Sequence, residues 1–138
     1  MSQSKQRYTA ERWWKTAQED LKVGNKLMLD GYYAHACFSA QQAGEKTVKA
    51  LWYLFDQEPW GHSIQRLLLE FSASDQLADY PQCVQAGASL DRLYIGTRYP
   101  NGLPDLTPSE NYFQVDAEAS IATARFLMER IAPLFKAG

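Results

Sequence analysis

A strip of polar side chains crosses a segment, residues 32–55, that is otherwise small and apolar. Gln42, Glu45, Lys46 and Lys49 recur every three or four residues, which places them on one side of a helix. The spacing leaves two interpretations open. The strip is a solvated face whose Glu45–Lys49 pair contributes about 0.3 kcal/mol. Alternatively, it is the wall of a polar groove or a partner surface, where the amide and ammonium groups hold phosphate or carboxylate groups.

A second candidate lies near residue 100, where Tyr94 and Arg98 share one side of a predicted helix with Asp91. A cation at the C-terminal end of a helix complements the helix dipole, which is the structural explanation of Arg98. The functional explanation is that Arg98 points at an anionic ligand or at a carboxylate of another helix. In that case Tyr99 and Pro100 fix the following loop.

The few histidines and cysteines give little support to metal or thiol chemistry. His62 lies beside a predicted helix start and His35 near another, so a capping or packing role for His62 is favoured over catalysis. Cys37 and Cys83 lack CxxC spacing, which argues against a disulfide framework and a zinc site. The common metal, phosphate-loop and hydrolase motifs are absent from the sequence. We therefore expect no metal and no cofactor.

Composition indicates one globular domain spanning residues 1–138, with frayed ends at 1–8 and 137–138. The chain is 46% hydrophobic and 22% charged, with a formal net charge of −2, so no global positive field points to nucleic acid. The start of the chain is polar, and no run of 18 apolar residues occurs that would span a membrane. We expect a cytoplasmic, reduced protein without membrane association.

Capping residues and breakers divide the chain into helices. Thr9 is a candidate N-cap for the first helix, Gly31 a C-terminal cap, and Ser63 an N-cap for a short helix. Thr107-Pro108-Ser109-Glu110 has the form of a capped helix start, which allows the last helix to begin earlier than Gln114. The predicted helices cover residues 9–30, 32–55, 64–71, 82–99 and 114–136.

The central predicted helix carries a broad apolar arc, which indicates more than one neighbour. Ala36, Ala40, Ala43 and Gly44 lie on that arc and would let another helix approach closely. The short link at Gly31 predicts an antiparallel hairpin with the preceding helix. No segment alternates convincingly as a strand, so the fold class is all-α: an up-and-down helical bundle of four long or medium helices plus one short helix.

Aromatic residues make up 13% of the chain, more than one side of each helix can bury. Aromatic residues are enriched at protein interfaces, so a homodimer is the economical explanation. Stacking on nucleic-acid bases is less favoured, because the aromatic residues are not interleaved with basic ones.

An ordered set of segments resembles the HEPN (higher eukaryotes and prokaryotes nucleotide-binding) domain family. The match extends over nearly the whole chain, and residues 40–50 are its most specific part. The segments that carry it are Trp14…Ala17…Asp20-Leu21, GYYAHACF (31–38), AQQAGEKTVKA (40–50), His62-Ser63-Ile64 with Leu67-Leu68, and Tyr94 with Arg98-Tyr99-Pro100.

The resemblance implies a small helical bundle that is usually dimeric and is often encoded beside a minimal nucleotidyltransferase, in a toxin–antitoxin-like system. It implies either nucleotide or nucleic-acid binding, or metal-independent RNase activity. In the binding case the protein would be a non-catalytic subunit, with Glu45 orienting a lysine and two tyrosines framing the site. The expected site residues are Gln42, Glu45, Lys46, Lys49, His62, Tyr94, Arg98 and Tyr99.

The RNase branch of the family uses an Arg-x4–6-His motif, which this sequence lacks. At the required spacing, Arg98 is followed by Leu103, Pro104 and Asp105. Without that histidine no obvious group performs the acid–base step on a ribose 2′-hydroxyl. A non-catalytic partner subunit is therefore the leading hypothesis. The alternatives are a divergent RNase that uses Arg98 with His62 or Tyr99, and a structural homodimer in which the polar strip meets the second subunit.

Overall fold

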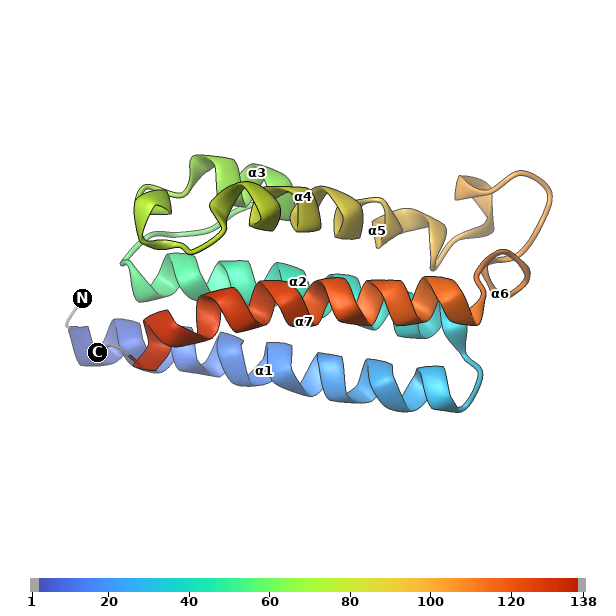
Figure 1. Ribbon diagram of the computed structural model, residues 1–138, viewed down its shortest axis with the longest axis horizontal. Coiled ribbons are helices and arrows are strands. Elements are labelled where there is room, and N and C mark those ends of the chain that lie inside the picture. The colour runs from blue at the N-terminus through green and yellow to red at the C-terminus, as the bar shows by residue number, and fades with distance from the viewer. Residues whose placement is uncertain (1–2, 137–138) are drawn as a thin grey trace.

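The computed structural model describes residues 3–136 and confirms the all-α prediction (Figure 1). Within the described residues there is no strand. Single 3₁₀ turns lie at Ser74–Gln76 and Pro100–Gly102. The helices are α1 (Gln3–Leu29), α2 (Tyr33–Leu54), α3 (Ile64–Glu70), α4 (Tyr80–Asp91), α5 (Leu93–Gly96), α6 (Pro108–Asn111) and α7 (Gln114–Lys136).

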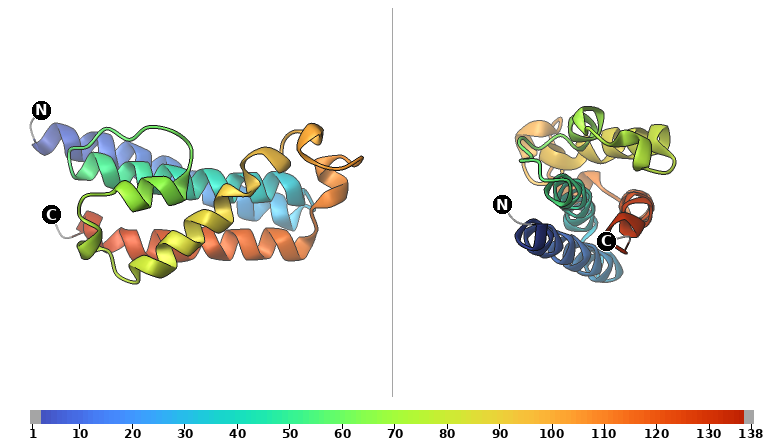
Figure 2. Two further views of the ribbon diagram at one scale, coloured as in Figure 1. Left: turned by 90° about the horizontal axis from the view of Figure 1, so that it is seen from above. Right: turned by 90° about the vertical axis from the view of Figure 1, so that its left-hand side faces the viewer.

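Helix α2 is the centre of the bundle. Seen end-on, it lies between α1, α7 and the layer formed by α3 and α4 (Figure 2). The long helices run alternately up and down, so both ends of the chain lie at the same end of the molecule (Figure 1). The broad apolar arc of α2 is therefore used against several neighbours, as predicted. No helix in the described range 3–136 combines the length and hydropathy that crossing a membrane requires.

Small residues allow the close helix contacts that the sequence predicts. A Cβ added to Gly44 would lie 2.6 Å from Cδ1 of Leu90 on α4, so α2 and α4 could not pack this closely around a larger residue. A Cβ on Gly24 of α1 would lie 3.0 Å from the Cβ of Ser39. Ala36, Ala40 and Ala43 are fully buried in the core.

The link between α1 and α2 is the predicted glycine-capped turn. Gly31 has a φ of +87°, a conformation that glycine adopts without the steric cost of a Cβ. The backbone N–H of Tyr32 donates to the carbonyl of Leu27 at 2.8 Å, which satisfies a group left unpaired at the end of α1. α1 and α2 consequently form the antiparallel hairpin expected from the sequence.

The prediction of a frayed segment over residues 1–8 is wrong for residues 3–8, and Thr9 is not an N-cap. These residues are the first turns of α1. Arg7 pairs with Glu11 and donates to the backbone carbonyl of Phe135 at the end of α7. That contact joins residues 128 positions apart, so local sequence patterns could not indicate it. Residues 1–2 and 137–138 lie outside the described residues.

The single helix predicted over residues 82–99 is also wrong, because it is divided at Arg92 into α4 and α5. The chain begins to leave helical geometry after Gly96, and Tyr99, which precedes Pro100, is extended. The Thr107 capping box forms as predicted, with Glu110 bonding back to Thr107. It begins the separate helix α6, and α7 starts at Gln114.

Candidate functional site

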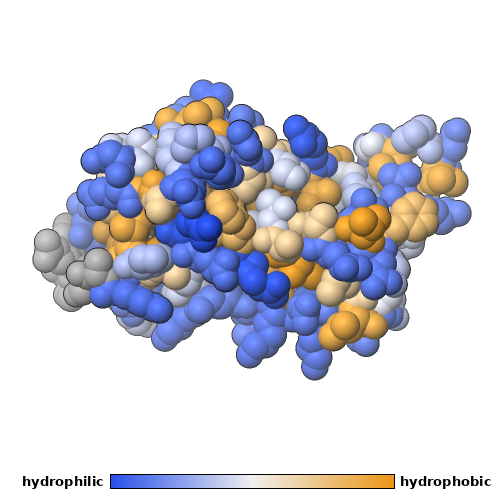
Figure 3. All heavy atoms as spheres, in the orientation of Figure 1, coloured by the Kyte–Doolittle hydropathy of each residue, from blue (hydrophilic) through white to orange (hydrophobic). Residues whose placement is uncertain are grey.

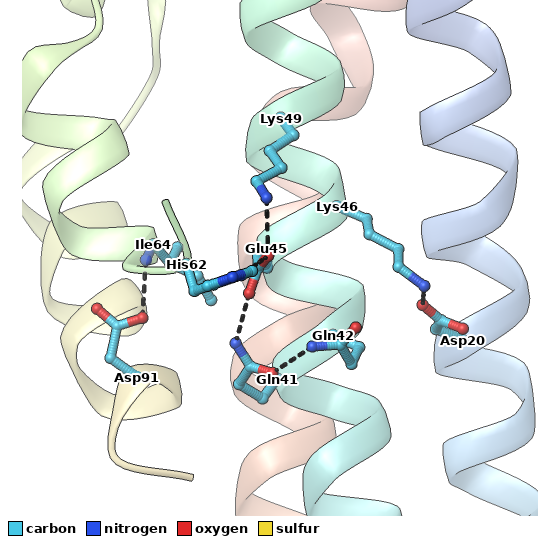
Figure 4. A network of polar contacts seen from close by, with 9 residues as sticks. All are labelled: Asp20, Gln41, Gln42, Glu45, Lys46, Lys49, His62, Ile64 and Asp91. Carbon is cyan, nitrogen blue, oxygen red and sulfur yellow. Dashed lines mark hydrogen bonds and ion pairs between the residues drawn. The ribbon is translucent and has the colours of Figure 1, made fainter. Parts of the chain in front are cut away.

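The carboxylate of Glu45 is the centre of a buried polar network on α2 (Figure 4). Its Oε1 accepts a hydrogen bond from Nε2 of Gln41 at 3.0 Å. Its Oε2 lies 3.0 Å from both Nζ of Lys49 and Nδ1 of His62. The side chains of Glu45 and Lys49 are only 7% and 12% exposed, so the predicted i,i+4 pair forms but is not solvated. One carboxylate thus holds together residues of α2 and of the loop before α3.

The remaining residues of the polar strip form no direct hydrogen bond or ion pair with that carboxylate among the described residues. Lys46 pairs with Asp20 of α1, its Nζ lying 2.7 Å from Oδ2 (Figure 4). Gln42 donates from Nε2 to Oε1 of Gln41 at 2.8 Å. The two lysines of the strip are therefore each matched with an acidic side chain of the same molecule.

His62 connects this network to the second candidate cluster. Its ring stacks on Tyr94 of α5, with centroids 5.1 Å apart and an interplanar angle of 19°. Because a carboxylate only accepts hydrogen bonds, the contact with Glu45 requires the proton on Nδ1. The other ring nitrogen, Nε2, has no hydrogen-bond partner among the described residues, and the side chain is 61% exposed.

The loop that carries His62 is fixed by Asp91 of α4. Its carboxylate accepts hydrogen bonds from Oγ of Ser63 at 2.9 Å, from the N–H of Ile64 at 2.7 Å and from the N–H of Gln65 at 3.1 Å. Ser63 also caps α3 by accepting from the N–H of Arg66, as its N-cap prediction required. Asp91 thereby satisfies donors at the start of α3 and positions His62 beside α2.

Arg98 lies among aromatic rings and has no carboxylate partner within the described residues. Its guanidinium carbon is 4.6 Å from the ring centres of Phe38 and Tyr94 and 4.9 Å from that of Tyr99. Nε donates to the backbone carbonyl of Tyr94 at 3.0 Å, the contact expected of a cation at a helix end. The sequence had left open a carboxylate of another helix as its target, and none pairs with it in residues 3–136.

The cysteines are poor nucleophiles. Burial raises the pKa of the Cys37 thiol, and it raises the pKa of Cys83 to about 11. Both are free and buried, so neither is a thiolate near neutral pH. Among the described residues, no group of three or more His, Cys, Asp and Glu side chains is arranged to hold a metal ion.

The structure brings most of the sequence-predicted residues into one continuous chain of contacts, from Lys49 through Glu45, His62 and Tyr94 to Arg98. It also adds residues that the sequence argument did not assign to the site: Gln41, Asp20, Phe38 and Asp91. The adjacent glutamine pair at 41–42 was the only available signal for Gln41. Asp20 and Phe38 reach the site through tertiary packing, which no local spacing reveals.

Comparison with known proteins decides the family. The protein-family model described as "HEPN domain" matches residues 10–133 of this chain. The chain belongs to the HEPN domain family. This HEPN chain is 27% identical over 134 residues to a Methanocaldococcus jannaschii protein named "Putative toxin MJ1304", covering 92% of this chain and 88% of that one.

Solved structures support the same assignment. The HEPN chain is similar to TT1696 of Thermus thermophilus, with a TM-score of 0.85, 32% identity, and coverage of 91% of this chain and 97% of the other. An archaeal HEPN homologue, ST0689, gives a TM-score of 0.76 at 32% identity, with the same coverages. A HEPN domain protein of Thermotoga maritima gives 0.71 at 26% identity, covering 91% and 98% of the two chains.

Proposed function

We propose that this HEPN protein is a non-catalytic subunit that binds a phosphate-bearing ligand, a nucleotide or RNA, through Arg98 and His62. We further propose that it acts as the partner of a minimal nucleotidyltransferase in a cytoplasmic toxin–antitoxin-like system. The relative named as a toxin supports the second part of the proposal, together with the association of such pairs with the HEPN family.

The observation that carries the proposal is the unpaired charge of Arg98. Its ring contacts hold the guanidinium in place, and Nε is occupied by the Tyr94 carbonyl, which leaves the terminal nitrogens for another acceptor. Arginine suits phosphate because its planar donors match two oxygens at once. Lys46 and Lys49 are already neutralised by Asp20 and Glu45, so they contribute less to anion binding.

The same region suits the homodimer that we propose. Ile95 and Tyr99, on either side of Arg98 in sequence, are 46% and 48% exposed and supply apolar and aromatic surface that a second subunit would cover. Light scattering coupled to size exclusion measures the subunit number directly. We expect a dimer, and a monomer at micromolar concentration would contradict this part of the proposal.

Purification of the tagged protein from its native source tests the partner assignment. Copurified proteins are identified by mass spectrometry, and bound nucleotides are extracted and separated. We expect a nucleotidyltransferase, a nucleotide or both, with the nucleotide reduced in Arg98→Gln and retained in the matched control Arg92→Gln. A homodimer with nothing bound would reject the proposal and favour a structural role.

A second candidate, a divergent metal-independent RNase, is favoured by one specific observation. Glu45 fixes Nδ1 of His62, so the exposed Nε2 carries a lone pair in the neutral ring. It could take the proton of a ribose 2′-hydroxyl, while Arg98 binds the phosphate that this oxygen attacks. The bond between phosphorus and the 5′-oxygen then breaks, which leaves a 2′,3′-cyclic phosphate, and the departing 5′-oxygen takes a proton from water to become a 5′-hydroxyl.

This candidate is tested by incubating the purified, partner-free protein with RNA of mixed sequence in the presence of a metal chelator. Cleavage that is lost in His62→Gln and in Arg98→Gln, but retained in the control His35→Gln, would support an RNase. Absence of cleavage by the wild-type protein would reject it while leaving the binding proposal intact.

A further inference from the structure

The groove between α1 and α7 lies apart from the polar network and shares no residue with it. We propose that this groove docks an acidic amphipathic helix of a protein partner. The proposal does not depend on the proposed function, because it concerns a different pair of helices and a different kind of ligand.

The groove has an apolar floor. Trp14 and Leu21 of α1 face Met128 and Ala132 of α7 around a cavity of about 430 Å³. At one end Trp14 stacks on Phe135, with ring centres 5.0 Å apart, so the floor is held by packing within the core. The space-filling view of this side of the molecule shows apolar surface broken by hydrophilic side chains along the two helices (Figure 3). An apolar trough of this kind is covered when a partner binds.

Positive charge borders the floor from both helices. Lys22 and Lys26 line the groove from α1, and Arg125 lines it from α7. None of these three side chains forms an ion pair within the described residues. Glu129 is the acidic side chain in the lining. The groove therefore carries a local excess of cations although the whole chain has a formal net charge of −2.

The shape favours a helix over other occupants. From Trp14 to Lys26 the groove follows α1 for roughly 18 Å at 1.5 Å per residue, which matches a partner helix of about twelve residues. A trough between two helices covers one side of its occupant, as in helix-in-groove recognition, where apolar anchors recur every three or four residues. Cations on both sides of the groove complement acidic residues that flank the apolar stripe of the partner helix. A nucleic acid would leave the apolar floor without a partner.

A designed peptide tests the proposal. Its helix carries leucines at three- and four-residue spacing and glutamates on both flanks, and a scrambled peptide of the same composition is the control. Isothermal titration is performed with the full chain. We expect the designed peptide to bind and the scrambled one not to bind. The double variant Lys22→Glu/Lys26→Glu should weaken binding by at least about tenfold, because rim charges of reversed sign repel the peptide.

Lys15→Glu is the matched control, since Lys15 is exposed on α1 outside the groove lining and should change affinity by less than about twofold. Thermal melting establishes that each variant folds, and Arg125→Glu replaces the double variant if that one does not. Equal binding of both peptides, or unchanged affinity in the reversed-charge variant, would overturn the proposal. The proposal would also be overturned if the wild-type chain self-associates without peptide and the reversed-charge variant does not. The occupant of the groove would then be a second copy of this chain.

Discussion

The chain of contacts from Lys49 to Arg98 has two ends, and each end places a cation in a different environment. At the Glu45 end, Lys49 is 12% exposed and its charge is matched by a buried carboxylate that also holds Gln41 and His62. At the Arg98 end, the cation lies against three aromatic rings and has no carboxylate partner in residues 3–136. A lysine or arginine on a helix face is thus available to a ligand only where the fold leaves its charge unmatched. We expect the Glu45 end to affect stability and the Arg98 end to affect binding.

Removal of the shared carboxylate should have the largest effect on stability. In Glu45→Gln, the largely buried Lys49 side chain, 12% exposed, loses its counter-charge, and we expect the free energy of unfolding to fall by about 3 kcal/mol. Urea denaturation measures this change. The control is Glu11→Gln, which removes the more exposed Arg7 pair and should change stability by less than about 1 kcal/mol. Similar small effects of the two variants would refute the distinction between a buried and an exposed pair.

Asp91 joins the two ends, because it fixes the loop that carries His62. In Asp91→Ala, the start of α3 loses three hydrogen bonds, and we expect a destabilisation of about 2 kcal/mol. Asp75→Ala, in the 3₁₀ turn after α3, is the comparison variant with an expected change within about 0.5 kcal/mol. Hydrogen exchange should show faster exchange at Ile64 and Gln65 in Asp91→Ala. Unchanged protection of those two amides would contradict the role assigned to Asp91.

Tyr94 should stabilise the fold through its aromatic ring, which contacts His62 and Arg98, and not through its hydroxyl group. Tyr94→Ala removes the surface that His62 and Arg98 share, so we expect a loss of roughly 1.5 kcal/mol. Tyr94→Phe keeps the ring and should stay within about 0.5 kcal/mol of the wild type. Thermal unfolding of both variants checks the difference. Equal destabilisation by the two substitutions would show that the hydroxyl is the stabilising group.

Cys83 belongs to neither end, and the contribution of its ionisation is confined to alkaline pH. Burial raises the pKa of its thiol from 9.0 to about 11. Since the folded pKa is the higher one, its contribution to stability is complete below the unfolded value and is lost as pH rises toward about 11. In Cys83→Ala, the free energy of unfolding should therefore fall less steeply over that interval. Identical slopes in variant and wild type would contradict the raised pKa.

The sequence predicted those features that depend on local spacing. α2 and α7 are bounded by glycine, proline or loop residues, and Glu45 and Lys49 are four residues apart on one helix, so both were visible as patterns. The structure was needed for contacts between distant segments. Glu45 and His62 are 17 positions apart, and Arg98 meets Phe38 of α2 through packing of α5. The same limitation explains the helical residues 3–8, which Arg7 anchors to the end of α7.

One binding experiment separates the two ends most directly. The affinity of a fluorescein-labelled single-stranded RNA of roughly ten nucleotides is measured by anisotropy for the wild type, Arg98→Gln and Lys49→Gln, each first shown to be folded. We expect Arg98→Gln to weaken binding by at least about tenfold, because it removes an unpaired guanidinium. Lys49→Gln should weaken it by less than about threefold, because Glu45 already neutralises that lysine. Equal losses in the two variants, or a greater loss in Lys49→Gln, would contradict the assignment of anion binding to Arg98.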